Sequence, residues 1–165
     1  MDQTHIHLLI THLPIFGSIL GGFVLAYGLW SKSNQTKIAA YYVLIISAIG
    51  AGISYLTGEA AEETVENLQG VSETLIEQHE EFALFALIGL IMVGLFALIG
   101  LYITLINSTL IRTVALITFV LSIISFGLVA RTGYLGGQIR HSEIRNGANG
   151  QINSTENKEQ SNDDD

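Results

Sequence analysis

Four long apolar runs, separated by polar segments, dominate the pattern of hydrophobic and polar positions along the chain. They cover roughly residues 8–30, 38–57, 83–106 and 110–131. At a rise of about 1.5 Å per residue, a helix of this length crosses about 30 Å of hydrocarbon. Charged residues are absent from the middle of all four runs. The pattern therefore predicts four transmembrane helices.

Two of the connections between these runs are very short. One is the polar turn 31–36, which holds Lys32 and is followed by Lys37. The other is 107–109, followed by Arg112. Helices joined by so few residues are antiparallel neighbours. We therefore predict an all-α fold, an integral membrane four-helix bundle with up-down-up-down topology.

The chain also repeats itself. An offset of 72 residues places His7 on His79, and an offset of 75 places Thr57-Gly58 on Thr132-Gly133. A unit of histidine, apolar helix, short turn, apolar helix and Thr-Gly thus occurs twice. Two-span units of this kind are parallel repeats, related by a pseudo-two-fold axis along the membrane normal. Repeated glycines should let the helix backbones approach closely; they are Gly17/Gly89, Gly22/Gly94 and Gly28/Gly100.

Helices are expected to extend past the apolar runs at one end. Gly70 and Ser72 suit a helix stop and an N-cap, so the third helix should begin just after them and carry His79 into the bilayer. By the repeat, the first helix begins near the N-terminus and has a kink at Pro14. The two Thr-Gly pairs are expected to close the second and fourth helices. We predict a transmembrane domain over 1–142.

Composition agrees with a membrane protein and limits its chemistry. Of the 165 residues, 49% are hydrophobic and only 13% are charged, whereas a soluble domain carries about 25% charged residues. A chain without cysteine forms no disulfide, thiolate metal site or covalent c-type haem attachment. No basic patch exists to meet the phosphates of a nucleic acid. The polar and acidic tail, 143–165, is predicted to be disordered.

The distribution of charge predicts an orientation in the membrane. The short turns carry lysine and arginine without acids, whereas the connection 59–81 carries eight glutamates and no basic residue. The positive-inside rule then puts both turns in the cytoplasm and both termini outside. The N-terminus lacks the basic region of a cleaved signal peptide. The inverted orientation is the alternative, and it keeps the same structure.

The histidines gather at the predicted outer end of the bundle. His7 and His79 occupy matching places on helices 1 and 3, which lie diagonally across a bundle of this topology. Two imidazoles facing each other across a bundle core can ligate haem iron from both sides. His12, inside the apolar run, is an alternative to His7 or a ligand of a second metal, because a buried polar side chain there needs a partner. His5 and His141 are expected to bind water at headgroup level.

A non-haem metal site is the competing interpretation of the same residues. His7, His12 and His79, with Glu62 or Glu63, offer imidazole and carboxylate ligands that suit zinc, copper or iron. Their spacing matches no helical metal-binding motif.

Arg131 stands at the outer end of the fourth run and should need an anion, because an unpaired charge leaving water is strongly unfavourable. We expect it to face inward and to pair with Glu59 or Glu62. A haem propionate is the second candidate, and snorkelling to lipid phosphate or water is the third.

Three motifs resemble a known family. They are His7-x4-His12-Leu13-Pro14-Ile15, the histidine that opens the third span, and Gly133-x2-Gly136-Gly137-x3-His141. Over about residues 5–142, the chain resembles the DUF2231 family of bacterial four-span membrane proteins. It departs from the family at Leu8 (usually proline), Leu13 (usually phenylalanine) and Ser142 (usually glycine). The resemblance implies a multi-pass protein of the bacterial inner (cytoplasmic) membrane. Since the family domain is sometimes fused to cytochrome c or Rieske modules, it also implies a redox setting.

Two functions agree with these observations. The first is a redox-associated membrane subunit, with a b-type haem held by His79 and either His7 or His12 and with a redox protein or a larger membrane complex as partner. The second is a non-enzymatic membrane scaffold or complex subunit whose histidines bind at most a metal ion. The sequence contains no nucleophile–base pair, nicotinamide motif or phosphate loop, so we predict neither a standalone hydrolase nor a dehydrogenase.

Overall fold

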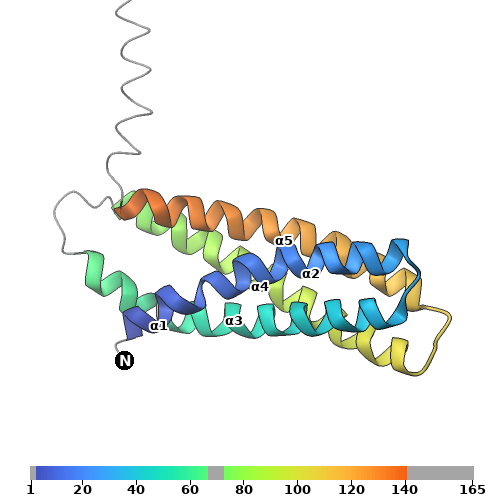
Figure 1. The fold of residues 1–165 in the computed structure, drawn as a ribbon. Helices are drawn as coiled ribbons and strands as arrows, with labels where there is room; N and C mark the ends of the chain where they lie inside the picture. The colour runs from blue at the N-terminus through green and yellow to red at the C-terminus, as the bar shows by residue number, and fades with distance from the viewer. Residues whose placement is uncertain (1–2, 67–72, 141–165) are drawn as a thin grey trace, which may run out of the picture.

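The computed structural model, which describes residues 3–66 and 73–140, is a bundle of helices (Figure 1). The helices are α1 (Gln3–Ile10), α2 (His12–Trp30), α3 (Asn34–Glu66), α4 (Glu73–Leu105) and α5 (Ile111–Arg140). α1 leads into α2 with a single residue between them, so the bundle has four long helices. No strand occurs within the described ranges. The predicted all-α four-helix bundle is confirmed.

The helices pack in a ring. α3 lies between α2 and α4, and α5 lies between α4 and α2, whereas α2 and α4 are diagonal to each other. Along α2 and α3, Gly17 lies against Ser47 and Gly28 lies against Lys37, so the two helices run in opposite directions. α4 and α5 form a second hairpin of the same kind (Figure 1).

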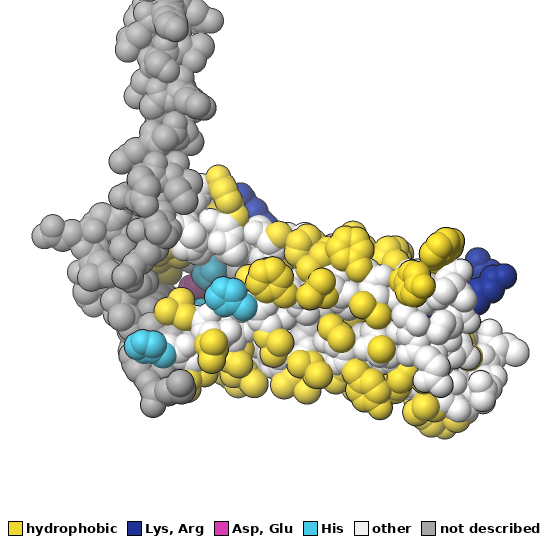
Figure 2. Space-filling model, viewed as in Figure 1, with side chains coloured by type: hydrophobic (Ala, Val, Ile, Leu, Met, Phe, Trp, Pro, Cys, Tyr) yellow, Lys and Arg dark blue, Asp and Glu magenta, His cyan; other side chains and the backbone are white. Residues whose placement is uncertain are grey.

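All four long helices are apolar enough to cross a membrane. Large apolar side chains cover the outside of the bundle, and Phe16, Phe23 and Ile124 are exposed (Figure 2). Such a surface suits lipid rather than water. The chain is a multi-pass membrane protein. α3 and α4 have 33 residues each, which is about 50 Å at 1.5 Å per residue and exceeds the hydrocarbon thickness of about 30 Å.

The six repeated glycines are all points of close helix approach. At each of them, an added Cβ would lie 3.0 Å or less from an atom of a neighbouring helix. The shortest such distance, 2.5 Å, is at Gly100, which lies against the ring of the fully buried Tyr41. The predicted packing role of these glycines is confirmed.

The two short turns have the same backbone structure. In the first, the Ser33 N–H donates to the Gly28 carbonyl over 3.1 Å, and Lys32 has a φ of 57°. Ser108 makes the equivalent bond in the second turn, where Asn107 has a φ of 53°. This arrangement is a Schellman motif, with a left-handed residue just after the helix. The turns correspond at the offset of 75 residues, whereas the two-fold relation of the complete halves stays a prediction.

Helices α3 and α5 are longer than their apolar runs. Both pass through their Thr-Gly pairs, Thr57-Gly58 and Thr132-Gly133, so the prediction that these pairs close the helices is wrong. A glycine inside a helix costs about 1 kcal/mol relative to alanine. The hydrogen bonds and packing of a long helix outweigh so small a preference.

The predicted beginnings of the other two long helices agree better with the structure. α4 is helical from its first described residue and carries His79. The kink predicted at Pro14 takes the form of an interruption at Thr11. Proline has no N–H, and its ring clashes with the carbonyl four residues earlier, here that of Ile10, which ends α1. The predicted caps Gly70 and Ser72 and the tail 143–165 lie outside the described residues.

Candidate functional site

His7 reaches from α1 to the last part of α3. Its Nδ1 lies 2.9 Å from the Ser54 carbonyl oxygen and 3.2 Å from Thr57 Oγ1. A carbonyl accepts only a donated hydrogen, so the proton sits on Nδ1 and the lone pair on Nε2. Gly58 leaves room for the ring, because a Cβ there would lie 3.6 Å from His7 Cε1. The end of α3 therefore fixes both the position and the tautomer of His7.

His79 is held in a similar way by α5. Its Nδ1–H donates to the Thr132 carbonyl over 3.0 Å. The half-buried ring packs against Gly136, where an added Cβ would lie 3.0 Å from Cε1 and 3.3 Å from Nδ1. His79 therefore also presents an Nε2 lone pair, and Gly136 is the surface on which its ring lies.

The two histidines lie at the same end of the bundle. His79 lies within range of the electrostatic influence of His7. The space-filling view shows histidine side chains gathered at one end of the bundle, around and inside a hollow in the surface (Figure 2). The pairing of His7 with His79 in one site stays a prediction.

His12 does not join this pair. It is exposed, its Nδ1–H donates to the Leu8 carbonyl over 2.9 Å, and its ring stacks with Phe16 at a centroid distance of 6.4 Å. The prediction that His12 is buried is wrong. Pro14 is buried, and a residue two positions from it lies about 200° around the helix, which turns His12 outward. His5 is exposed, as expected.

Arg131 also departs from its predicted position. It is exposed, not inward-facing, and its guanidinium carbon lies 5.5 Å from the ring centroids of both Phe82 and Tyr134. Such cation–π contacts contribute about 0.5–1 kcal/mol at exposed sites, which partly compensates the charge. The side chains of the predicted partners, Glu59 and Glu62, lie outside the described residues.

The described part of the chain contains no group of three or more histidine, aspartate or glutamate side chains that could hold a metal ion. In the predicted set, His12 faces away from His7 and His79. The carboxylates of Glu62 and Glu63 lie outside the described side chains. The donor set that the structure brings together is therefore a pair of imidazoles.

Nothing in the sequence points directly to the residues that orient these imidazoles. Ser54 and Thr132 act through backbone carbonyls, and a backbone acceptor leaves no side-chain pattern. No sequence pattern indicated that the His79 ring packs against Gly136. Only the repeated Thr-Gly pairs marked the region of α3 and α5 that holds the two rings.

Comparisons with known proteins assign no family to this chain. No protein-family model matches the chain, and neither a curated protein nor a solved structure matches it. The resemblance to the DUF2231 family stays a prediction.

Proposed function

We propose that this membrane protein binds a b-type haem through His7 and His79 and serves as a redox-associated subunit. One observation carries the proposal: at the same end of the bundle, the imidazoles of His7 and His79 each donate their Nδ1–H to a helix carbonyl. Histidines that ligate metals usually have the other ring nitrogen fixed in this way, which sets the tautomer and the ring plane. Both Nε2 lone pairs would then be available to hold the haem iron.

The donor pair fits haem better than it fits a bare metal ion. A protein zinc site takes three or four protein ligands, whereas a haem needs only two axial side chains because the porphyrin supplies the other four nitrogens. Gly58 and Gly136, beside the two rings, keep bulky side chains away from them. A haem held there would supply one-electron chemistry, and the chain itself would hold and orient it.

The expected setting is the bacterial inner membrane, with both termini outside and with a redox protein or a larger membrane complex as partner. The resemblance to the DUF2231 family and the charge distribution support this setting. Under this orientation, the haem lies near the outer face.

A second candidate function rests on the same hydrogen bonds. His7 ties α1 to α3, and His79 ties α4 to α5. In a non-enzymatic scaffold or complex subunit, these bonds would serve only to hold the helices together, and the histidines would bind at most a metal ion.

Absorption spectroscopy tests the proposal. The protein is expressed with ample haem precursor, and its Soret band is recorded before and after reduction. We expect His7→Ala and His79→Ala to lose the band and the matched variants His5→Ala and His12→Ala to keep it. Imidazole added to His79→Gly should restore the band, since it replaces the missing ligand.

A colourless wild-type protein would refute haem binding and leave the scaffold function. Equal loss of the band in His12→Ala would refute the assignment of the ligands. A thermal unfolding scan of each variant separates loss of haem from loss of fold.

A further inference from the structure

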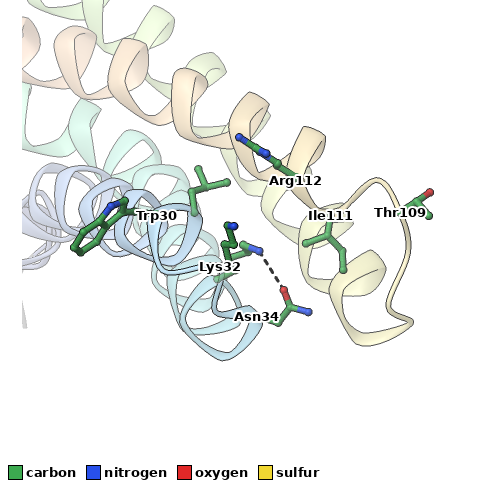
Figure 3. A pocket seen from close by; sticks show the side chains of 8 residues that line it. Trp30, Lys32, Asn34, Thr109, Ile111 and Arg112 are labelled. Atoms are coloured by element: carbon green, nitrogen blue, oxygen red, sulfur yellow. Dashed lines mark hydrogen bonds between the residues drawn. The ribbon is translucent and has the colours of Figure 1, made fainter.

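The end of the bundle opposite the histidines contains a second site. A cavity of about 460 Å³ lies where the turn between α2 and α3 meets the beginning of α5 (Figure 3). Three of its lining residues are the cations Lys32, Lys37 and Arg112, and the described residues that line it include no carboxylate. The proposed haem site does not involve this cavity.

The burial of Lys37 is unusual. The residue is only 6% exposed, and its stem packs against Gly28, where an added Cβ would lie 3.0 Å from Lys37 Cγ. Its Nζ donates to the neutral Asn34 Oδ1 over 3.1 Å. Arg112 lies close enough for the two like charges to repel each other. A cation largely removed from water normally lies beside an anion, and none of the described residues that line the cavity supplies one.

Lys32 adds a third cation at a backbone position that disfavours it. Its φ of 57° is left-handed, a conformation that glycine and asparagine adopt most readily. The corresponding residue of the other turn is Asn107. The turn structure therefore does not require lysine here, although the lysine side chain lines the cavity.

Two helix N-termini add further positive potential. Asn34 begins α3 and Ile111 begins α5, and both residues line the cavity. The N-terminus of a helix carries a partial positive charge and free N–H groups that favour anions, phosphate among them.

The remaining wall of the cavity is apolar. Leu29, Ile111 and Trp30 line it, and Trp30 is 80% exposed (Figure 3). Tryptophan is enriched at the level of lipid headgroups. The positive-inside rule explains cations that face water, but it does not explain a lysine buried beside an arginine. The cavity thus combines a cationic centre with a lipid-facing apolar side.

We propose that this cavity binds the phosphate group of an anionic phospholipid, between Lys32, Lys37 and Arg112, with the acyl chains along Leu29 and Trp30. Basic pockets between transmembrane helices are suited to such headgroups. Inorganic phosphate shares this chemistry and is the other possible source of the anion.

Trp30 gives a direct measurement, because it is the only tryptophan of the chain. The full-length protein is reconstituted in phosphatidylcholine vesicles, and brominated phosphatidylglycerol or brominated phosphatidylcholine quenches its fluorescence. We expect phosphatidylglycerol to quench more strongly at equal mole fraction. Lys37→Met and Arg112→Gln should each weaken this preference about five-fold. Lys158→Gln removes the same charge from the tail and should leave the preference unchanged.

The Lys32→Asn variant distinguishes a loss of lipid binding from misfolding of the other variants. Asparagine tolerates the left-handed turn, so this variant should fold at least as well as the wild type and still lose about five-fold in lipid preference. Equal quenching by the two lipids, with no effect of millimolar inorganic phosphate, would overturn the proposal, as would an unchanged preference in all three cavity variants. If inorganic phosphate alone protects the protein from thermal unfolding and the lipids quench equally, the site binds free phosphate and the lipid source is rejected.

Discussion

At the scale of single residues, the histidine site depends on glycines as much as on histidines. Gly136 is the surface on which the His79 ring lies, at a separation too short for any other residue without movement. Gly58 lies beside His7 at an ordinary van der Waals distance. The two positions therefore differ in how much a methyl group would disturb the neighbouring imidazole.

We expect Gly136→Ala to displace the His79 ring and to weaken its bond to the Thr132 carbonyl. Crowding of a packed site costs about 1–3 kcal/mol, which exceeds the gain of at most about 1 kcal/mol from replacing glycine within a helix. Equilibrium unfolding in mixed detergent micelles measures the net loss, and NMR of the His79 ring reports its displacement.

Gly58→Ala is the matched control, because it adds the same methyl group beside the other histidine. Its Cβ would lie 3.6 Å from His7, so we expect unchanged stability or a gain of up to about 1 kcal/mol. If both substitutions destabilised the protein equally, this would contradict the role of Gly136 as the surface on which the His79 ring lies.

The repeat was sufficient to predict that His7 and His79 occupy matching positions at one end of the bundle, but side-chain direction was harder to predict. His12 lies in an apolar run, which suggests burial, yet in a membrane protein the outside of a helix is apolar as well. The lipid-facing and core-facing sides of α2 therefore look alike in the sequence. Arg131 is exposed beside the rings of Phe82 and Tyr134, two partners that no sequence pattern indicated.

At the scale of the helices, close packing is concentrated at a few glycines. An added Cβ at Gly17 would lie 2.7 Å from Ser47 Cβ, at the contact of α2 with α3. Gly127 has no atom within 4 Å of such a Cβ. Both glycines lie inside helices, so their helix propensity is the same.

We expect Gly17→Ala to destabilise the bundle by about 1–3 kcal/mol, because two backbones must separate. Gly127→Ala should be neutral or stabilising by up to about 1 kcal/mol. Denaturation in sodium dodecyl sulfate measures both values. Similar effects of the two substitutions would indicate that the change in stability comes from the conformational freedom of glycine and not from the contact between helices.

Helix existence could be predicted from the sequence, whereas helix ends could not. The apolar runs are long, and in lipid every backbone group must be bonded internally, so α-helices follow directly. The prediction that the Thr-Gly pairs end α3 and α5 was wrong, because the cost of a glycine within a helix, about 1 kcal/mol, is small beside the packing energy of these helices. The helix interruption caused by Pro14 was predicted correctly, since no packing can supply the missing N–H of proline.

At the scale of the whole molecule, the bundle has two different ends. The short turns with Lys32 and Arg112 form one end, and the histidines lie at the other. The absence of cysteine makes the orientation easy to measure, since single cysteines can be introduced without a background.

We expect a membrane-impermeant maleimide to label His5→Cys, but neither Ser31→Cys nor Thr109→Cys, when it is added outside intact cells. All three residues are exposed. The reverse pattern would show the inverted orientation. Labelling of only one of the two turn positions would contradict the four-span arrangement, because an even number of crossings places both turns on one side.

The length of the helices has a consequence for what can reach the histidines. α3 and α4 exceed the hydrocarbon by about 20 Å, and the exposed Glu77, Glu80 and Glu81 place this excess at the histidine end. These glutamates give α4 an acidic surface at the histidine end of the bundle. With this excess outside the hydrocarbon, the histidines would be reached from water, whereas the short turns at the opposite end would lie level with the lipid headgroups.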